Sequence, residues 1–350
     1  MSDQNLTGIG LIGLGRLGRV RAEIAARQLP NGRLAVVHDI DADLTATVAA
    51  EYGAIAVDSV KALVNHPDVD GVIVATPTAL HVDPVLAVAA AAKPLFCEKP
   101  LASTLADTRQ LVETIDAAGI ACHIGFNRRH DPDHLQARQM IANGAIGTAT
   151  YLRSNIRDPF PPPPWALDPN TGGGLFIDML IHDIDAARML MGQEIVSVYA
   201  STANLVVDPE GIEGFADNAT VSFTFANGAL GQFHASVHAR YGYDVRAEVF
   251  GADGNIAIGR LNKRDLTLMT EAGGLTQPTT FQTRDGIPHA MFRFAEAYRD
   301  EIIAFADTIT NGTTPTVNHH DALAAFRVAI ACQQSATERR PIELTELQSM

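Results

Sequence analysis

A glycine-rich turn near the start of the chain constrains the fold more than any other stretch. Residues 8–14 are apolar and predict a short strand that runs into the glycine turn Gly13-Leu14-Gly15-Arg16-Leu17-Gly18, and a helix follows as far as Ala26. Residues 34–38 predict a second strand, which ends at Asp39, about 20 residues after the last glycine. A strand, this glycine spacing, a helix and a second strand ending in an acid together indicate a dinucleotide-binding βαβ unit.

Each part of this turn has a separate physical task. Gly13 permits the tight turn, Gly15 lets backbone N–H groups approach a pyrophosphate, and Gly18 allows the helix to pack closely on the strand. The sequence therefore predicts that cofactor contacts come from Gly13, Gly15, Arg16, Leu17 and Gly18.

Asp39 bears on which cofactor is bound. A carboxylate here accepts hydrogen bonds from ribose hydroxyls and repels a 2′-phosphate, and no Arg follows in residues 40–43, so NAD is favoured over NADP. Helix capping is the rival role for Asp39, but Asp41 is better placed to cap the next helix.

The strand–helix alternation continues with short strands at 57–58, 71–75, 94–97 and 121–125. The continuous apolar run at 71–75 is typical of a parallel sheet covered on both faces, whose ligands bind at the carboxyl ends of the strands. Cofactor contacts are therefore also expected from the residues near those ends, which are Thr76, Pro77, His81, Glu98 and Lys99.

Two of these residues have alternative interpretations. His81 opens a helix, where a cap or a surface residue is the more usual role. Lys99 is held beside Pro100, where its cation can hydrogen-bond a substrate hydroxyl and stabilise a developing alkoxide, but it could instead form a surface charge pair with Glu98.

A second glycine-rich turn, 172–174, leads into another predicted helix. Asp178 and His182 are four residues apart and Asp185 follows three later, so the three side chains share one helical face. A carboxylate beside a histidine fixes its tautomer and stabilises the imidazolium, which suits a general base. The alternative is a solvated, charged helix face.

Taken in order, these motifs and Phe126-Asn127-Arg128-Arg129 resemble the glucose-fructose oxidoreductase/inositol dehydrogenase (Gfo/Idh/MocA) family. The resemblance implies an α/β protein with an N-terminal NAD-binding Rossmann domain (1–126). A C-terminal substrate and oligomerisation domain (127–350) would be built on a large, open, mostly antiparallel sheet. It also implies that Lys99, Asp178 and His182 are the catalytic residues.

The second domain shows the expected pattern when its residues are taken alone. Strands are predicted at 149–157, 195–206, 218–225, 230–238, 245–250 and 255–258, with a polyproline loop at 158–165 and helices at 289–310 and 320–337. A sheet with one face on the His182 helix would leave the other face exposed, and an exposed apolar face of that size argues for a partner. The family commonly pairs such faces, so a homotetramer is expected.

Within the family the likeness is nearest to inositol 2-dehydrogenases, through Arg157-Asp158-Pro159 and the segment from Tyr241 to Gly251. By family position, Arg129, Asp185 and Tyr241 would surround a polyol together with the catalytic residues, and Asn155 would be a further hydroxyl reader. The expected reaction is NAD-dependent oxidation of an inositol hydroxyl to the ketone. An aldose dehydrogenase of the same family is an alternative, and a catalytically silent NAD-bound regulator is an alternative of another class.

Composition excludes several other functions. The formal net charge of −14 argues against nucleic acid or an anionic membrane as a main partner. Three scattered cysteines imply neither a disulfide framework nor a zinc knuckle, and His319-His320 resembles a loop or helix cap, so no metal is expected. No signal peptide and no membrane span are predicted, and the expected location is the cytoplasm.

Overall fold

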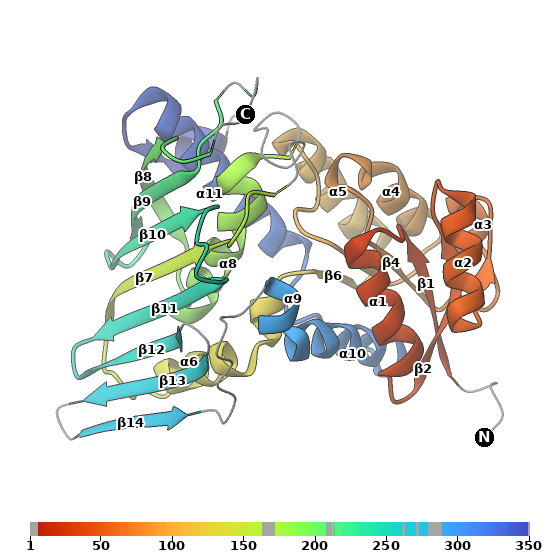
Figure 1. Cartoon of the computed structure of the whole chain (residues 1–350), viewed down its shortest axis with the longest axis horizontal. Coiled ribbons are helices and arrows are strands. Elements are labelled where there is room, and N and C mark those ends of the chain that lie inside the picture. The colour runs from red at the N-terminus through yellow and green to blue at the C-terminus, as the bar shows by residue number, and fades with distance from the viewer. Residues whose placement is uncertain are drawn as a thin grey trace. The chain divides into compact units, whose positions relative to one another are not determined.

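The computed structural model describes residues 6–162, 172–207, 212, 214–260, 263–270, 273–278 and 289–348. Prolines 163–164 and Trp165 of the predicted polyproline loop lie outside these residues. The chain divides into two compact units (Figure 1). Unit 1 comprises Met1–Asn127 and Glu296–Leu323, and unit 2 comprises Arg128–Ala295 and Ala324–Met350.

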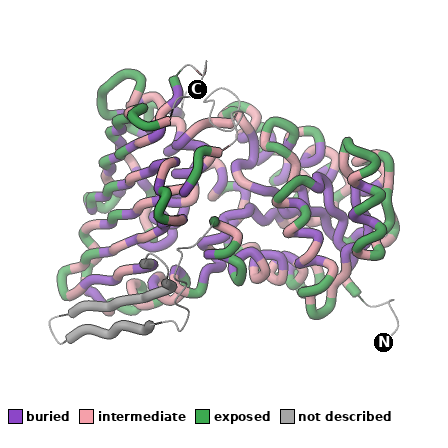
Figure 2. Tube along the Cα trace, in the orientation of Figure 1, coloured by how far each residue is buried: buried purple, intermediate pink, exposed green. Residues whose placement is uncertain are grey.

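In its described residues, unit 1 is built on a six-stranded parallel sheet. The strand order is β3-β2-β1-β4-β5-β6, so the order reverses between β1 and β4, which is where an open α/β sheet binds its ligand. The strands are β1 (Thr7–Ile12), β2 (Gly32–His38), β3 (Ile55–Ala56), β4 (Gly71–Val74), β5 (Leu95–Cys97) and β6 (Cys122–Ile124). The four central strands are almost wholly buried, as expected for a sheet covered on both faces (Figure 2). Only β3 lies off its prediction, two residues earlier than 57–58.

Five helices follow these strands in the described chain, and a polar side chain caps three of them. The five are α1 (Arg16–Arg27), α2 (Ala42–Tyr52), α3 (Val60–Val64), α4 (Val82–Ala90) and α5 (Leu105–Ala118). The capped helices are α2, α3 and α5. Asp41 caps α2 by accepting from the Leu44 N–H at 3.0 Å, which confirms its predicted role. Thr104 caps α5 in the same manner.

Unit 1 also contains a late helix that the sequence analysis placed in the substrate domain. From Glu296 onward, α10 (Ala295–Asn311) packs on the Rossmann sheet, with the Phe305 ring 6.0 Å from Phe96 and 5.5 Å from His123. A Cβ at Gly71 would lie 2.4 Å from the side chain of Ile309, so this glycine makes room for the helix. The placement was missed because these contacts join residues some 200 positions apart.

Unit 2 contains a nine-stranded sheet within its described residues, in the order β14-β13-β12-β11-β7-β10-β9-β8-β15. Only β7 and β10 pair in parallel, so the prediction of an open, mostly antiparallel sheet is confirmed. The strands are β7 (Ala149–Arg157), β8 (Ile195–Ala203), β9 (Asn218–Phe225), β10 (Leu230–Ser236), β11 (Asp244–Gly251), β12 (Gly254–Arg260), β13 (Lys263–Thr270), β14 (Gly273–Pro278) and β15 (Ile342–Glu343). The sequence analysis missed β13, β14 and β15.

Helices cover one face of this sheet (Figure 1). They include α6 (Pro132–Ala142), α8 (Ile181–Met191) and the part of α11 (His319–Glu338) that belongs to unit 2. On β7 the alternation is clear, because Leu152, Ser154 and Ile156 are buried whereas Arg153 is exposed. The short helix α9 (Ala290–Arg293) precedes α10, so the predicted helix at 289–310 is interrupted at Phe294.

The opposite face of the sheet carries many polar side chains. Its described side chains include Arg153 on β7, Ser222 on β9, Gln232 and His234 on β10, and Arg246 and Glu248 on β11. Exposed Tyr199, Leu230 and Phe250 lie on the same face, so it is mixed rather than continuously apolar. The homotetramer stays a prediction. No helix of the described chain combines the length and apolarity needed to cross a membrane.

Candidate active site

In the glycine turn of unit 1, neighbouring backbone leaves no room for a side chain at two glycines, whereas the third glycine faces open space. Gly13 has φ +90°, and a Cβ there would lie 2.6 Å from the Thr76 amide nitrogen. A Cβ at Gly18 would lie 2.0 Å from the Gly13 carbonyl oxygen, so neither position accepts a side chain. A Cβ at Gly15 would have no atom within 4 Å, which leaves room for a ligand beside the turn.

Helix α1 begins at this open position with an uncapped amino end. Gly15 is its N-cap, no side chain accepts from its first N–H groups, and its first turn contains no acid. Such a helix end binds an anion through its N–H groups and its dipole. The turn therefore fits the pyrophosphate of a dinucleotide.

Asp39 lies beside the same turn. One of its carboxylate oxygens accepts from the Leu14 N–H at 2.7 Å, and the other accepts from the Asp41 N–H at 3.0 Å. A carboxylate offers about four lone-pair sites, so both oxygens retain capacity for ribose hydroxyls. The carboxylate thus fits an adenosine ribose, and the two backbone contacts fix its position.

The turn after β5 carries Lys99, which is half-buried. Its neighbour Glu98 is not a surface residue, because it is 5% exposed and accepts two hydrogen bonds from the Arg21 guanidinium, at 2.8 and 2.5 Å. The alternative of an exposed Glu98–Lys99 charge pair is therefore wrong.

His81 is buried rather than exposed, and its side chain caps no helix. Its Nε2 lies 2.9 Å from the carbonyl oxygen of Thr76, and its Nδ1 lies 3.0 Å from that of Pro100. Burial lowers the pKa of this imidazole, although the carbonyls act in the opposite sense. His81 thus joins the turns that follow β4 and β5, and its direct contact with the cofactor stays a prediction.

The segment with the second glycine turn differs from a plain α-helix. Residues Leu175–Leu180 form a π-helix, labelled η4, and α8 follows directly. π-helical turns are rare and occur frequently at functional sites. Asp178 lies in the π-helical part and His182 in the first turn of α8, so the predicted helix is confirmed, and its first half is π-helical.

Burial separates Asp178 and His182 from the rest of this segment. Both side chains are half-buried, whereas every other residue from 175 to 191 is buried. The two predicted catalytic residues are therefore the most exposed ones on the segment, and they are four residues apart. This pattern argues against the alternative of a solvated, charged helix face.

Asp185, the third acid of the motif, is fully buried. It accepts from Arg129 Nε at 2.9 Å and from Arg129 Nη2 at 2.7 Å, a bidentate pair that holds the guanidinium in a fixed plane. Arg188 approaches the same carboxylate at 3.4 Å. Burial and these contacts indicate that Asp185 orients Arg129 rather than reading a hydroxyl itself.

Asn155 lies on the wrong side of the sheet for its predicted role. Its neighbour Ser154 bonds to Asp183 of α8, so by strand alternation Asn155 lies on the face opposite α8 and His182. There it donates to the Asp244 carbonyl oxygen at 3.2 Å. This placement argues against a contact between Asn155 and the substrate of His182, and that contact stays a prediction.

Tyr241 is half exposed and is held at its hydroxyl. The hydroxyl accepts from Arg157 Nη1 at 3.1 Å and donates to Asp244 Oδ2 at 3.0 Å. Its predicted contact with a polyol stays a prediction.

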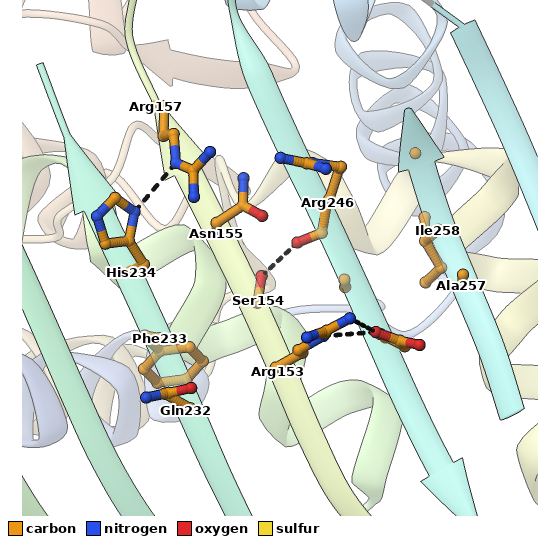
Figure 3. Close-up of a pocket in the computed structure, with 13 residues that line it drawn as sticks. Arg153, Ser154, Asn155, Arg157, Gln232, Phe233, His234, Arg246, Ala257 and Ile258 are labelled. Atoms are coloured by element: carbon orange, nitrogen blue, oxygen red, sulfur yellow. Dashed lines mark hydrogen bonds and ion pairs between the residues drawn. The ribbon is translucent and has the colours of Figure 1, made fainter. Parts of the chain in front are cut away.

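The sheet face opposite the helices contains a cavity of about 500 Å³ that the sequence analysis did not foresee (Figure 3). Arg153 pairs there with Glu248, and Arg157 and Arg246 both pair with the buried Asp244. The acids largely offset the arginines, so the cavity shows no strong preference for one charge.

One group of three potential metal ligands occurs in the described residues, at Asp116, His319 and His320. Each histidine Nε2 lies at hydrogen-bond distance from Asp116 Oδ1, 2.9 Å for His319 and 3.0 Å for His320. In these hydrogen bonds the Nε2 atom of each histidine carries the ring proton. A metal bound at Nε2 would require that proton on Nδ1 instead, and no described group bonds to Nδ1 of His319 to stabilise that tautomer. The geometry is explained by two hydrogen bonds.

Comparison with known proteins gives the family of the chain. Residues 7–126 match the family model "Oxidoreductase family, NAD-binding Rossmann fold", and residues 134–257 match the GFO/IDH/MocA C-terminal domain. The chain belongs to the Gfo/Idh/MocA oxidoreductase family. Unit 1 therefore contains an NAD-binding Rossmann domain, and the resemblance drawn from the motifs is confirmed.

Similar proteins include several inositol dehydrogenases. The chain is 35% identical to a myo-inositol 2-dehydrogenase of Thermotoga maritima, over 97% of this chain and 99% of that protein. It is 36% identical to a scyllo-inositol 2-dehydrogenase (NAD(+)) of Bacillus subtilis, over 95% of each. A crystal structure of scyllo-inositol dehydrogenase from Lactobacillus casei, with bound NAD(H) and scyllo-inositol, matches with a TM-score of 0.84 at 26% identity, covering 97% of this chain and 99% of that one.

The sequence analysis missed two buried charged residues of unit 1, Arg21 and Glu301. A signal was present, because Arg21 interrupts the buried stripe of α1 formed by Gly18, Ala22 and Ala25. A charge on a buried stripe requires a partner.

Proposed function

We propose that this protein is an NAD-dependent dehydrogenase that oxidises a secondary hydroxyl of inositol, or of a closely related cyclic polyol, to the ketone. The observation that carries the proposal is the paired accessibility of Asp178 and His182 on a segment that is otherwise buried. The inositol dehydrogenases among the relatives support the substrate class, and because they act on both myo- and scyllo-inositol they leave the isomer open.

In the proposed mechanism, His182 accepts the proton of the reacting hydroxyl. Asp178 orients the imidazole and offsets the positive charge that the ring gains. Lys99 donates a hydrogen bond to the same oxygen and stabilises its developing negative charge. When bound, NAD supplies the acceptor for the hydride that leaves the carbinol carbon.

The cofactor would be held by the glycine turn and by Asp39. The uncapped end of α1 binds the pyrophosphate, and the Asp39 carboxylate accepts from the ribose hydroxyls and repels a 2′-phosphate. Preference for NAD over NADP follows from that repulsion.

Arg129 is our candidate for reading the remaining hydroxyls of the polyol, because Asp185 holds its guanidinium in one plane. Tyr241 is the second candidate. An aldose dehydrogenase would use the same chemistry, and a silent NAD-bound regulator would require that Lys99, Asp178 and His182 do no chemistry. We also propose a homotetramer, on the family resemblance alone.

The test is NADH formation by the purified protein, with NAD or NADP and with myo-, scyllo- and chiro-inositol beside glucose, galactose and xylose. Selective turnover of an inositol with NAD is the expected result. Turnover of aldoses alone would replace the substrate class, and cofactor binding without any turnover would support the regulator.

A further inference from the structure

A buried arginine on α1 reaches the strand end that carries Lys99. Arg21 is completely buried, and its guanidinium lies over two rings, 4.9 Å from the centre of Phe96 and 5.0 Å from that of Tyr298. Its Nη1 donates to the Tyr298 carbonyl oxygen at 3.1 Å. The side chain is therefore fixed in one orientation by the groups around it.

Arg21 contacts β5 and the turn after it at two points. It lies over the ring of Phe96 and donates two hydrogen bonds to Glu98 Oε1, two residues further along. Residues two apart on an extended chain point to the same side, so the guanidinium holds both side chains from one direction. Gly125 leaves room for this carboxylate, because a Cβ there would lie 2.5 Å from Glu98 Oε2.

The other end of the same helix is the cofactor turn. Arg21 follows Gly18 by three residues, so the two lie on one stripe of α1, one turn apart. A single buried side chain thus links the helix that begins at the pyrophosphate turn to the residue that directly precedes Lys99.

A second carboxyl group approaches the same guanidinium. Glu301 of α10 is fully buried, and its Oε1 lies 2.5 Å from Arg21 Nη2. One cation with two carboxyl groups leaves an excess negative charge unless one of them is protonated, and burial raises the pKa of Glu301 to about 8. At neutral pH we therefore expect Glu301 to hold a proton.

We propose that Arg21 is a positioning residue, which fixes the Glu98–Pro100 turn against α1 and so places the Lys99 ammonium relative to the bound cofactor. The inference deepens the proposed function and rests on it for the role of Lys99. Arg21 itself touches no reacting atom, so its effect on turnover must act through Lys99.

The first test does not depend on turnover. Amide hydrogen exchange is measured across residues 95–102 in the full chain, for the wild type and for Arg21→Lys, which keeps the charge but loses the planar pair of N–H groups that hold Glu98. We expect faster exchange in this peptide. Arg293→Lys is the matched control, since Arg293 is also buried, pairs with Asp131 and Asp133 and lies over Phe294.

The second test is a double-mutant cycle on kcat with Arg21→Lys and Lys99→Met. Arg21→Lys alone should lower kcat about 10- to 100-fold, the size expected from a small misplacement, while the Kd of NADH changes less than about 2-fold. In the Lys99→Met background the same substitution should have almost no further effect. Glu98→Gln should reproduce this pattern if Arg21→Lys folds poorly.

The outcomes separate the two proposals. Unchanged exchange at 95–102, or additive effects in the cycle, would overturn the positioning role. Absence of turnover by the wild type with every polyol and sugar would overturn the proposed function, while the exchange measurement would still decide whether Arg21 fixes the turn.

Discussion

The buried carboxyl group of Glu301 makes the stability of this protein depend on pH in an unusual direction. Burial is the largest cause of its raised pKa, the charge of Glu98 adds to it, and Arg21 opposes it. Because the folded-state pKa of about 8 exceeds the ordinary value of 4.5, the folded protein holds this proton more tightly than the unfolded chain does. Its contribution to stability is fully present below pH 4.5 and is lost as pH rises through 8.

The size of the effect follows from the same two pKa values. Each pH unit between them costs about 1.4 kcal/mol of unfolding free energy, so the loss reaches about 4 kcal/mol at pH 8. Beyond that pH it levels off near 5 kcal/mol. We take this figure as an upper limit, since movement of side chains and water around an ionised Glu301 would lower the cost.

The assay is urea unfolding of the wild type and Glu301→Gln at pH 5.5, 7 and 8.5. The variant cannot ionise at this position, so its free energy of unfolding should increase relative to that of the wild type as pH rises. Glu113→Gln is the control, because Glu113 is exposed on α5 and should show no such trend. A difference that stays constant across the three pH values would refute the reasoning and mean that Glu301 is ionised beside Arg21.

Three further predictions concern the proposed reaction. His182→Ala should lower kcat by about 10²- to 10⁴-fold and leave the Kd of NADH nearly unchanged; a weakened Kd with normal kcat would contradict the assignment. Asp39→Ser should raise activity with NADP relative to NAD, measured as the ratio of kcat/KM values, and an unchanged ratio would mean that the 2′-phosphate is read elsewhere. Arg129→Ala should raise the KM for the polyol at least 10-fold, whereas Asn155→Ala should leave it unchanged, because Asn155 lies on the far face of the sheet from His182; equal effects would place both residues at the substrate.

The Rossmann half could be predicted from the sequence because its signals are local. The glycine spacing, the apolar strands and the cap at Asp41 each depend on a few neighbouring residues, and the structure contains all of them. The turn containing Lys99 was predictable for the same reason, since it directly follows a buried strand.

The sequence was less informative about properties that depend on distant residues or on exact register. Asn155 was placed by family position, and an offset of one residue on a strand moves a side chain to the other face. The π-helix at Leu175–Leu180 has no sequence pattern that separates it from an α-helix. The Arg21–Glu301 contact joins residues 280 positions apart, so no local pattern could predict it.

The burial of the segment from 175 to 191 restricts how this protein can change. All its residues other than Asp178 and His182 are buried, so substitutions elsewhere along it alter volume or buried charge and lower stability. Under the proposed mechanism, exchanging these two half-buried side chains would change the acid–base chemistry and disturb the packing least. A new reaction could then arise at two positions, whereas a new substrate of different shape would have to be accommodated by residues outside the segment.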